Sequence, residues 1–502
     1  MRSVWTRATN APLYPVLLAS TIVVATLLDV DVNVHAAIRP FLLVVAIAAA
    51  ATGLLVLTLG RVWGPLVAAG LVLLVRSGSI TYALLGVLLI GLVASAWVLA
   101  RRIRGGRLPL DRATRPFNGL AALLLLATVL NSAANGQLWR LEFGHGADRL
   151  DIGSPGEGRL PDVYVVILDG YPRADTLARL FDHDNSAFLE ALEREGFAVS
   201  AGASSNYMYT STTFASMLHM SYLDELNIRH EISTPSGISL RTLINDNPVW
   251  DAFRERGYQV AAIQPPWEHV AMRSADVFCG EALNEFELHM IRSTLIADGV
   301  RVVNPDFEAD VHRDNVEQAF HCLEELSHQS GGPKLVFTHV GSPHLPIVFD
   351  ASGEPADSRY FGHTAHEIDI SRSEYSAAYR GQVEYLNGRV LEAVERLGSR
   401  GDQPVVLVMS DHGSESQFNW ADARQSDIAE RMSILFAAKT PGKSGLFPCD
   451  VTPVTVMATL MNAYLGTGLR TPAARHFVST AQDKLTVIEA TDPDVRAGLR
   501  CP

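Results

Sequence analysis

Residues 161–175 of this 502-residue chain read PDVYVVILDGYPRAD. Within them, Val163–Leu168 is an uninterrupted run of apolar, mostly β-branched side chains, and it ends at Asp169-Gly170. A run of this length is typical of a strand that is buried on both faces, as the strands of parallel sheets are. Asp169 would then lie beyond the carboxyl end of a strand, where ligands bind in such sheets.

The same alternation continues through the second part of the chain. Short apolar runs predict strands at Phe197–Ser200, Gln259–Ile263, Lys334–Thr338, Pro404–Met409 and Ile434–Ala438. Helical periodicity between them predicts helices at Ser186–Glu195, Val249–Arg256, Val311–His328, Tyr375–Leu397 and Thr452–Leu465. Strands that alternate with helices indicate an α/β domain with a largely parallel central sheet. We place this domain at residues 161–470, with a C-terminal tail at 471–502.

The first part of the chain has a different composition. Five apolar runs occur before residue 140, at Leu13–Leu28, Ala37–Leu59, Val62–Val75, Ile80–Ala100 and Asn118–Ala134. Because about 17 to 20 apolar residues cross a bilayer, the sequence predicts an α-helical membrane domain of about five spans over residues 1–135. Four spans with a re-entrant third run are the alternative. A Gly-rich linker at residues 136–160 follows.

Charge separates the two parts as well. Residues 1–150 carry 13 Arg, no Lys and 5 acidic residues, and the remainder has a net charge of −21. A strongly acidic second part argues against nucleic acid as its partner. Six Arg lie between the fourth and fifth runs, whereas the segment Asp29–Asn33 between the first two has no basic residue. The positive-inside rule predicts a multi-pass protein of the inner (cytoplasmic) membrane with everything after about residue 136 outside, although Arg76 lies on the wrong side.

Possible metal ligands follow three of the predicted strands. Asp169 follows the first, His339 and His344 follow KLVFT, and the pair Asp411-His412 follows PVVLVM. A single acidic residue at such a position is more often a turn former or a helix cap. Together, carboxylates and imidazoles form a mixed oxygen and nitrogen set that suits Zn²⁺ or Mn²⁺.

Four segments resemble a known family. PDVYVVILDGYPRADT, SNYMYTSTTFASML, THVGSPHLP and VLVMSDHGSES are similar to motifs of the alkaline phosphatase superfamily. The resemblance is to its sulfatase-like membrane hydrolases and transferases, which include the lipoteichoic acid synthases and the lipid A phosphoethanolamine transferases. It covers about residues 160–465 and implies an alkaline-phosphatase-like catalytic domain that N-terminal helices anchor outside the cytoplasmic membrane.

The resemblance also implies roles for single residues. Asp169 matches the first acidic metal ligand of the family, and Asp411 and His412 match its late ligand pair. Thr210 matches the metal-bound Thr nucleophile, in the frame Thr-x-x-Thr-Phe-Ala. His344 matches a His that contacts the substrate phosphate or a second metal.

Alternatives remain at these positions. Thr212 and Thr213 are alternatives to Thr210 as the nucleophile. The whole hydroxyl-rich run could also have only a structural role, as the cap at the start of a helix. His339 is the weaker of the two His candidates, because a structural role in packing accounts for it equally well.

Three departures from the family pattern matter. The Cys-x-Pro-Ser-Arg type of motif that formylglycine sulfatases require is absent. No His follows His412 within Ser414–Ile434, so one bound metal is expected rather than two. Lipid A transferases are also Cys-rich outside the membrane, whereas this chain has only Cys279, Cys322, Cys449 and Cys501. These four cysteines allow three disulfide pairings, among which the sequence does not choose.

The sequence supports three hypotheses for function. The first is a metal-dependent transferase that moves a phosphoethanolamine or phosphoglycerol type of group from a phospholipid donor to a glycan or lipid acceptor of the cell envelope, through a phospho-Thr intermediate. The second is a sulfatase-like hydrolase of phosphate or sulfate esters that works without formylglycine. The third is a non-catalytic membrane protein that keeps the fold.

Overall fold

The structure is a computed structural model of the chain. It describes residues 11–30, 32, 34–76, 114–134, 150, 160–226, 240–264, 267–280, 283–294, 296–362, 370–399, 403–419, 425–479, 487–490 and 501. The chain divides into two compact units. The first comprises residues 1–142 and 283–307, and the second comprises 143–282 and 308–502. The chain therefore passes from one unit to the other at three points.

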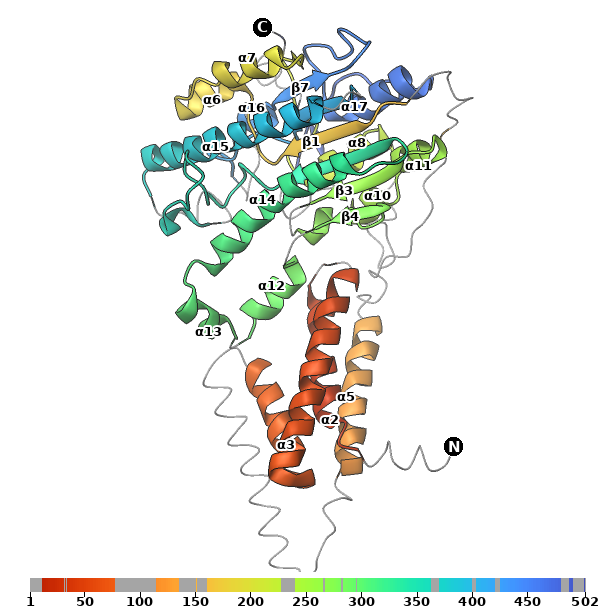
Figure 1. Cartoon of the computed structure of the whole chain (residues 1–502), viewed down its shortest axis with the longest axis vertical. Helices are drawn as coiled ribbons and strands as arrows, with labels where there is room; N and C mark the ends of the chain where they lie inside the picture. Colours follow the sequence, from red (N-terminus) through yellow and green to blue (C-terminus); the bar gives the residue numbers. More distant parts are fainter. Residues whose placement is uncertain are drawn as a thin grey trace, which may run out of the picture. The chain divides into compact units, whose positions relative to one another are not determined.

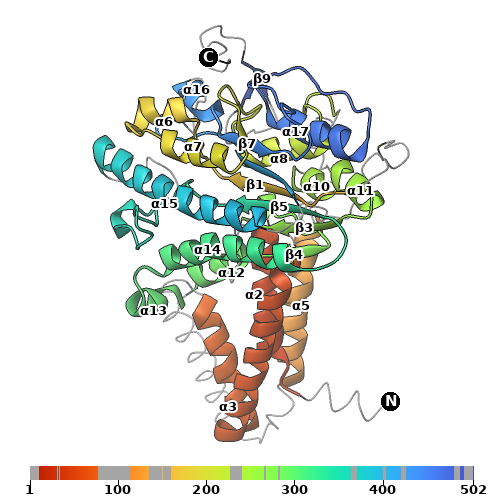
Figure 2. The same ribbon diagram turned by 45° about the horizontal axis from the view of Figure 1, so that its top comes forward.

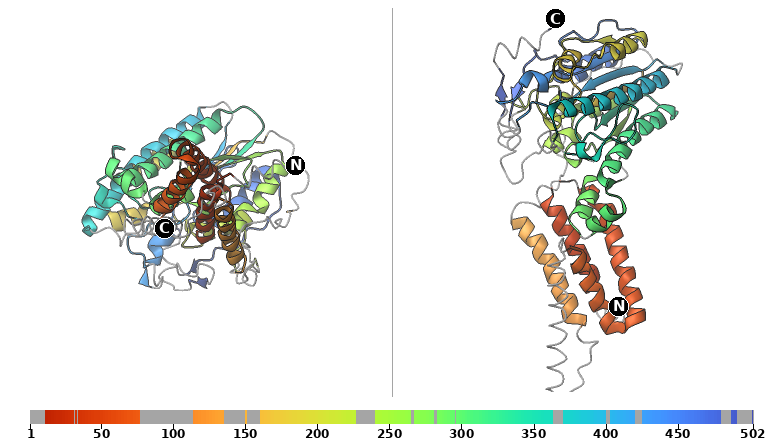
Figure 3. Two further views of the ribbon diagram at one scale, coloured as in Figure 1. Left: turned by 90° about the horizontal axis from the view of Figure 1, so that it is seen from below. Right: turned by 90° about the vertical axis from the view of Figure 1, so that its left-hand side faces the viewer.

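Three apolar helices form most of the described part of the first unit (Figure 1). They are α2 (Tyr14–Asp29), α3 (Val34–Arg76) and α5 (Thr114–Ala134). Helix α3 joins the second and third apolar runs and is kinked at Gly60, whose φ of 82° suits glycine. Helix α2 packs on both others, as Figure 3 shows. The amide oxygen of Asn118 in α5 accepts hydrogen bonds from the N–H groups of Leu13 and Tyr14, so it satisfies free donors at the start of α2.

One of these helical segments meets the length for a membrane span. Among the described residues, His35–Gly60 is long and apolar enough to cross a bilayer, and the apolar stretches Tyr14–Leu28 and Trp63–Leu73 are shorter. The predicted run Ile80–Ala100 lies outside the described residues. The prediction of five spans is thus not confirmed, and the boundaries 1–135 and 136–160 stay predictions.

The first unit also contains two short helices from much later in the sequence. They are α12 (Glu285–Arg292) and α13 (Ile296–Val303). Both lie within residues 283–307, which belong to the first unit although the segments before and after them belong to the second. No periodicity in the sequence indicated this excursion.

The second unit is built on a seven-stranded sheet with the order β2-β7-β6-β1-β5-β3-β4. The strands are β1 (Val163–Leu168), β2 (Ala198–Val199), β3 (Gln259–Ile263), β4 (Val277–Cys279), β5 (Lys334–Val340), β6 (Val405–Ser410) and β7 (Phe436–Lys439). The five strands from β6 to β4 are parallel to one another. At the other edge, β7 is antiparallel to both of its neighbours, β6 and β2. The prediction of a largely parallel sheet is therefore confirmed, and the sheet is mixed. Strands β1, β5 and β6 are buried throughout, as their uninterrupted apolar runs predict.

Helices cover both faces of this sheet (Figure 2). One face carries α6 (Ala174–Phe181), α7 (Ser186–Arg194), α14 (Phe307–His328) and α15 (Arg372–Gly398). The other carries α8 (Thr210–His219), α10 (Leu240–Asn245), α11 (Pro248–Glu255) and α17 (Pro453–Leu460), and α16 (Ile428–Met432) precedes β7. Each layer buries its own apolar core, and alternate side chains of β1 enter the two cores.

Short elements and two disulfides complete the unit. The short helices are η3 (Glu268–Val270), η4 (Ser358–Tyr360) and η6 (Met461–Leu465), and β8 (Phe477–Val478) pairs with β9 (Ile488–Glu489). The disulfides join Cys279 to Cys322 and Cys449 to Cys501, which selects one of the three possible pairings. In the predicted tail, Phe477 is buried and stacks on Tyr207 at 5.2 Å between ring centroids.

Candidate active site

The site begins with two adjacent strand ends. Asp169 directly follows β1, and Asp411 directly follows β6. The two strands are parallel neighbours in which Leu168 is paired with Ser410, so the next residue of each lies at the same edge of the sheet. Both aspartates are fully buried.

The backbone after β6 orients the imidazole of His412. Its Nδ1 lies 3.0 Å from the carbonyl oxygen of Gly413, where it can donate a hydrogen bond. This arrangement leaves the lone pair of Nε2 directed at the aspartates. The Nε2 atom lies 3.2 Å from Asp411 Oδ2 and 3.6 Å from Asp169 Oδ1.

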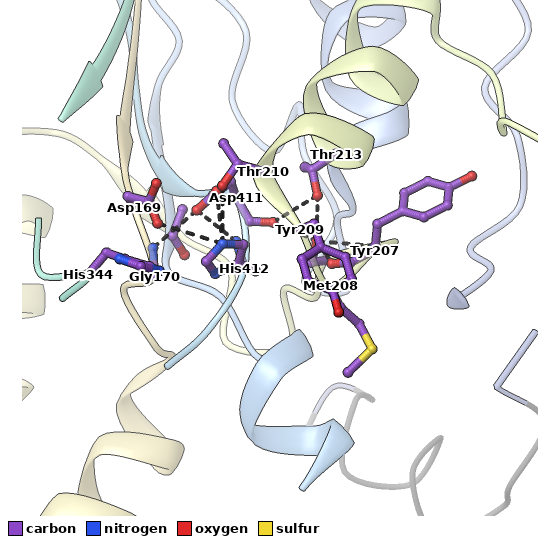
Figure 4. Close-up of polar contacts among 12 residues, drawn as sticks. Asp169, Gly170, Tyr207, Met208, Tyr209, Thr210, Thr213, His344, Asp411 and His412 are labelled. Carbon is purple, nitrogen blue, oxygen red and sulfur yellow. Dashed lines mark hydrogen bonds and ion pairs between the residues drawn. The ribbon is translucent and has the colours of Figure 1, made fainter. Parts of the chain in front are cut away.

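Ligand atoms of Asp169, Asp411 and His412 therefore converge (Figure 4). One ligand atom from each of these three buried residues lies within 4.8 Å of the other two. Asp169 Oδ1 and Asp411 Oδ2 are buried and have no hydrogen-bond partner among the described residues. Buried carboxylate oxygens without partners are costly, and they are the donor atoms that a divalent cation would satisfy. The residues present thus fit a metal.

The electrostatics of the aspartate pair support the same conclusion. Burial and the negative charge of Asp169 raise the pKa of Asp411 to about 6. Burial also opposes ionisation of Asp169, but His344, His339 and His412 lower its pKa below the ordinary range. Burial and the nearby Arg431 lower the pKa of His412 well below 6.5, so its imidazole is neutral and able to act as a ligand. A cation would allow both carboxylates to ionise together.

Thr210 is the hydroxyl that reaches this cluster. It is the first residue of α8, and its Oγ1 lies 3.2 Å from His412 Nε2 and is hydrogen-bonded to Asp411. Thr212 is buried, and its hydroxyl donates to the carbonyl of Tyr209. Thr213 is buried too, and its hydroxyl donates to the main-chain carbonyl of Asp411 at 3.3 Å. Of the three candidates, only Thr210 is partly exposed and directed at the ligand atoms.

The two His candidates differ in their contacts. His339, the sixth residue of β5, is fully buried and its Nε2 contacts Asp169 Oδ2 at 2.9 Å, so it holds the carboxylate in place. His344 follows β5, and its imidazole ring lies 6.0 Å from that of His412. Burial lowers the pKa of His344, but the carboxylates of Asp169 and Glu415 outweigh this effect and raise it overall. His344 keeps 17 % of its side chain exposed, which a residue that contacts substrate requires.

Arg431 is a site residue that the sequence did not indicate. Its guanidinium is almost fully buried, and it donates to the carbonyl oxygens of Met208 and Gly413 at 2.9 and 3.1 Å. One terminal nitrogen lies 3.2 Å from His412 Nε2. The residue thereby ties α16 to the segment before α8 and to the turn after β6. No pattern in the sequence marks it, because a single Arg in a short helix is ordinarily a surface residue.

Trp267 is a second residue that sequence reasoning missed. Its ring lies 5.6 Å from the His344 ring and 6.0 Å from the His339 ring. The residue follows β3, so it lies at the same end of the parallel sheet as Asp169. The position after a predicted strand was a usable signal here.

Comparisons with known proteins find similar structures only. No family model matches the chain, and no curated protein matches its sequence. The solved structures that it resembles include the C-terminal periplasmic domain of EptC from Escherichia coli in complex with Zn, with 13% identity, a TM-score of 0.42, and coverage of 67% of this chain and 94% of that chain.

Two further similar structures are a transferase and a sulfatase. One is the integral membrane protein lipooligosaccharide phosphoethanolamine transferase A (EptA) from Neisseria meningitidis, with 13% identity, a TM-score of 0.43, and coverage of 80% of this chain and 69% of that chain. The other is a 2-O GAG sulfatase, with 15% identity, a TM-score of 0.42, and coverage of 65% and 74%.

Proposed function

We propose that the chain is a membrane-anchored, metal-dependent transferase that moves a phospho-substituted group through a covalent intermediate on Thr210. One observation supports this proposal above the others. The Thr210 hydroxyl, at the first residue of α8, lies 3.2 Å from His412 Nε2, within a cluster of three buried ligand residues in which Asp169 Oδ1 and Asp411 Oδ2 have no hydrogen-bond partner among the described residues. A free Thr hydroxyl is a weak nucleophile, and coordination to a metal ion would make it reactive.

Asp169, Asp411 and His412 would hold the metal, with Thr210 as a fourth ligand. Zn²⁺ and Mn²⁺ both suit two carboxylates, one imidazole and one hydroxyl. When bound, the ion would lower the pKa of the Thr210 hydroxyl and neutralise negative charge on the phosphoryl oxygens. We expect a single ion, because the described residues offer one cluster of at least three such ligands.

The residues of the chain then carry out two transfers. In the first, Thr210 Oγ, which has lost its proton to solvent beforehand, forms a bond to the phosphorus of a phospholipid headgroup, and the bond from phosphorus to the diacylglycerol oxygen breaks. His344, whose pKa the carboxylates of Asp169 and Glu415 raise, would give a proton to the leaving oxygen. In the second, an acceptor hydroxyl gives its proton to His344 and attacks the phosphorus, which releases Thr210. The free N–H groups at the start of α8 favour the phosphate oxygens.

The proposed location is the outer side of the cytoplasmic membrane. The apolar helix His35–Gly60 and the segregated Arg of the first part support membrane anchorage. Two disulfides in the second unit suit an oxidising compartment. An anchor places the catalytic unit in the same layer as a lipid donor and an envelope glycan or lipid acceptor, which favours transfer.

Hydrolysis is the second candidate function. Both Thr210 and His344 keep part of their surfaces exposed, so water can reach the intermediate in place of an acceptor hydroxyl. Hydrolysis of sulfate esters through formylglycine is not proposed, because all four cysteines are in disulfides and the required motif is absent.

Intact-mass spectrometry of the full-length protein, incubated with mixed phospholipids, tests the proposal. We expect a mass increase equal to the transferred headgroup phosphate in the wild type and none in Thr210→Ala. Thr212→Ala is the matched control and should carry the adduct. An adduct that persists in Thr210→Ala would refute the assignment, and rapid loss of the adduct in water alone would favour the hydrolase.

A further inference from the structure

The excursion formed by α12 and α13 has an exposed apolar face. Beyond residue 135, four large hydrophobic residues among those described are exposed, and three of them lie on α13. Ile296, Val302 and Val303 are 50 %, 84 % and 86 % exposed, and the fourth is Ile488. Exposed aliphatic side chains that gather on one short element are typical of a contact with a partner or a membrane.

Helix α13 is amphipathic. At about 100° per residue, Ile296, Val300 and Val303 fall on one side of the helix. Asp298 and Arg301 fall on the opposite side, where they form an ion pair at 3.9 Å. An apolar side and a charged side on one helix are what a helix lying in a membrane interface presents.

Helix α12 connects the segment of residues 283–307 to the start of α3, the helix that is long enough to span a membrane. Asn284 caps α12 and its side-chain amide donates to the carbonyl oxygen of Ala36 at 3.0 Å. Glu287 forms a two-pronged ion pair with Arg39 of α3. Phe286 is fully buried in a cluster with residues of α2 and α3, including Ala37. These contacts fix α12 at the start of α3 and not along its length.

The start of α3 corresponds to the surface of a bilayer. The span His35–Gly60 has 26 residues, which is about 39 Å of helix, whereas the hydrocarbon layer takes about 30 Å. About 9 Å of the helix can therefore extend beyond the hydrocarbon, and the charge of Arg39, which is paired with Glu287, favours the start of α3 as an end that lies among the headgroups. The apolar surface of α3 continues from there, with Ile38, Leu42 and Leu43 exposed.

From these observations we infer that α13 lies in the membrane interface, with Ile296 and Val303 in contact with phospholipid and Asp298 and Arg301 facing water; Val302, about 40° from Asp298 around the helix, lies at the edge of the charged side. The occupant of the apolar face is the lipid surface that surrounds α3. A second copy of the chain is the competing occupant, and the experiment separates the two. This inference is independent of the transferase chemistry, and it adds a lipid contact at residues 296–303, far along the sequence from the first membrane segments.

Site-directed spin labelling of the full-length protein in phosphatidylethanolamine and phosphatidylglycerol nanodiscs tests this inference. Because the four native cysteines are paired, Val303→Cys introduces one reactive thiol. We expect a nitroxide there to be more accessible to oxygen, which partitions into lipid, than to a polar nickel chelate. Asp298→Cys is the control on the opposite side of the same helix and should show the reverse preference.

Two outcomes would overturn the inference. A label at Val303 that is as accessible to the nickel chelate as a label at Asp298 would place α13 in water. A label at Val303 that is protected from both reagents would indicate a protein contact, such as a second copy. Ile488→Cys calibrates an exposed aliphatic position of the sheet unit, and its label should behave as one in water.

Discussion

A single hydroxyl carries the proposed chemistry, and the structure separates it from its neighbours. We expect Thr210→Ala to fold and to lose turnover by several orders of magnitude. The nucleophile and the metal ligands act as one unit in catalysis, so removing the nucleophile also removes the effect of the ligands. Thr210→Ser retains the hydroxyl and should keep part of the activity. Headgroup release from phospholipid, measured together with the melting temperature, separates loss of chemistry from loss of fold.

Thr213→Ala is the matched variant for that comparison. Its hydroxyl donates to a carbonyl and lies in the core, so its loss should lower stability by about 1 kcal/mol and leave most of the turnover. If Thr213→Ala were inactive while Thr210→Ala worked at the wild-type rate, the nucleophile would lie one helical turn further along α8.

Asp411 predicts the pH dependence of the metal-free protein. Its pKa rises from 3.8 in the unfolded chain to about 6 in the fold, because burial and Asp169 oppose its charge. Its contribution to stability is therefore fully present below the unfolded pKa and is lost as the pH rises through about 6. We expect the melting temperature of the chelated wild type, measured relative to that of chelated Asp411→Asn, to be higher at about pH 5 than at about pH 7.5, because this comparison cancels the opposite contribution of His412.

The variant Asp411→Asn isolates this effect, since an amide does not titrate. Its chelated form supplies the reference for that comparison, and elemental analysis should find no retained metal after dialysis. A bound cation favours the ionised carboxylates and should reverse the trend in the wild type. Full metal content in Asp411→Asn would mean that Asp411 is not a ligand.

At the scale of elements, α12 depends on a capping box that also reaches α3. Glu287 bonds to the backbone of Asn284 and to Arg39. Glu287→Ala removes both contacts, so we expect hydrogen exchange over residues 283–294 to accelerate by at least about tenfold, the equivalent of about 1.4 kcal/mol of local opening.

Asp298→Ala is the control for that measurement. It breaks only an exposed ion pair within α13, and such pairs contribute little to stability. Exchange over residues 283–294 should stay near the wild-type rate in this variant. Equal acceleration in both variants would show that the contact with Arg39 does not hold α12.

At the scale of the whole molecule, the Arg distribution predicts topology. We expect an alkaline phosphatase or β-lactamase fusion at Gly153 to be active and one at Arg107 to be inactive, because only the first would be exported. The reverse pattern would place the sheet unit in the cytoplasm, away from the proposed lipid donor and acceptor.

The sequence alone was sufficient for the sheet and for most of the site. Strands such as Val163–Leu168 are short apolar runs that the pattern marks directly, and parallel strands bring their carboxyl ends together at one edge. Asp169, Asp411 and His412 could therefore be placed near one another, and the motif around Thr210 added the hydroxyl. These features are local, and each is visible in a few consecutive residues.

Only the tertiary structure decided the remaining features. Arg431 enters the site because α16 packs between two loops, and α12 joins the helical unit because Asn284 and Glu287 find partners in α3. The disulfide pairing likewise depends on distances between segments far apart in the chain. Apolar periodicity records which face of a segment is buried, but it does not record which distant partner buries it.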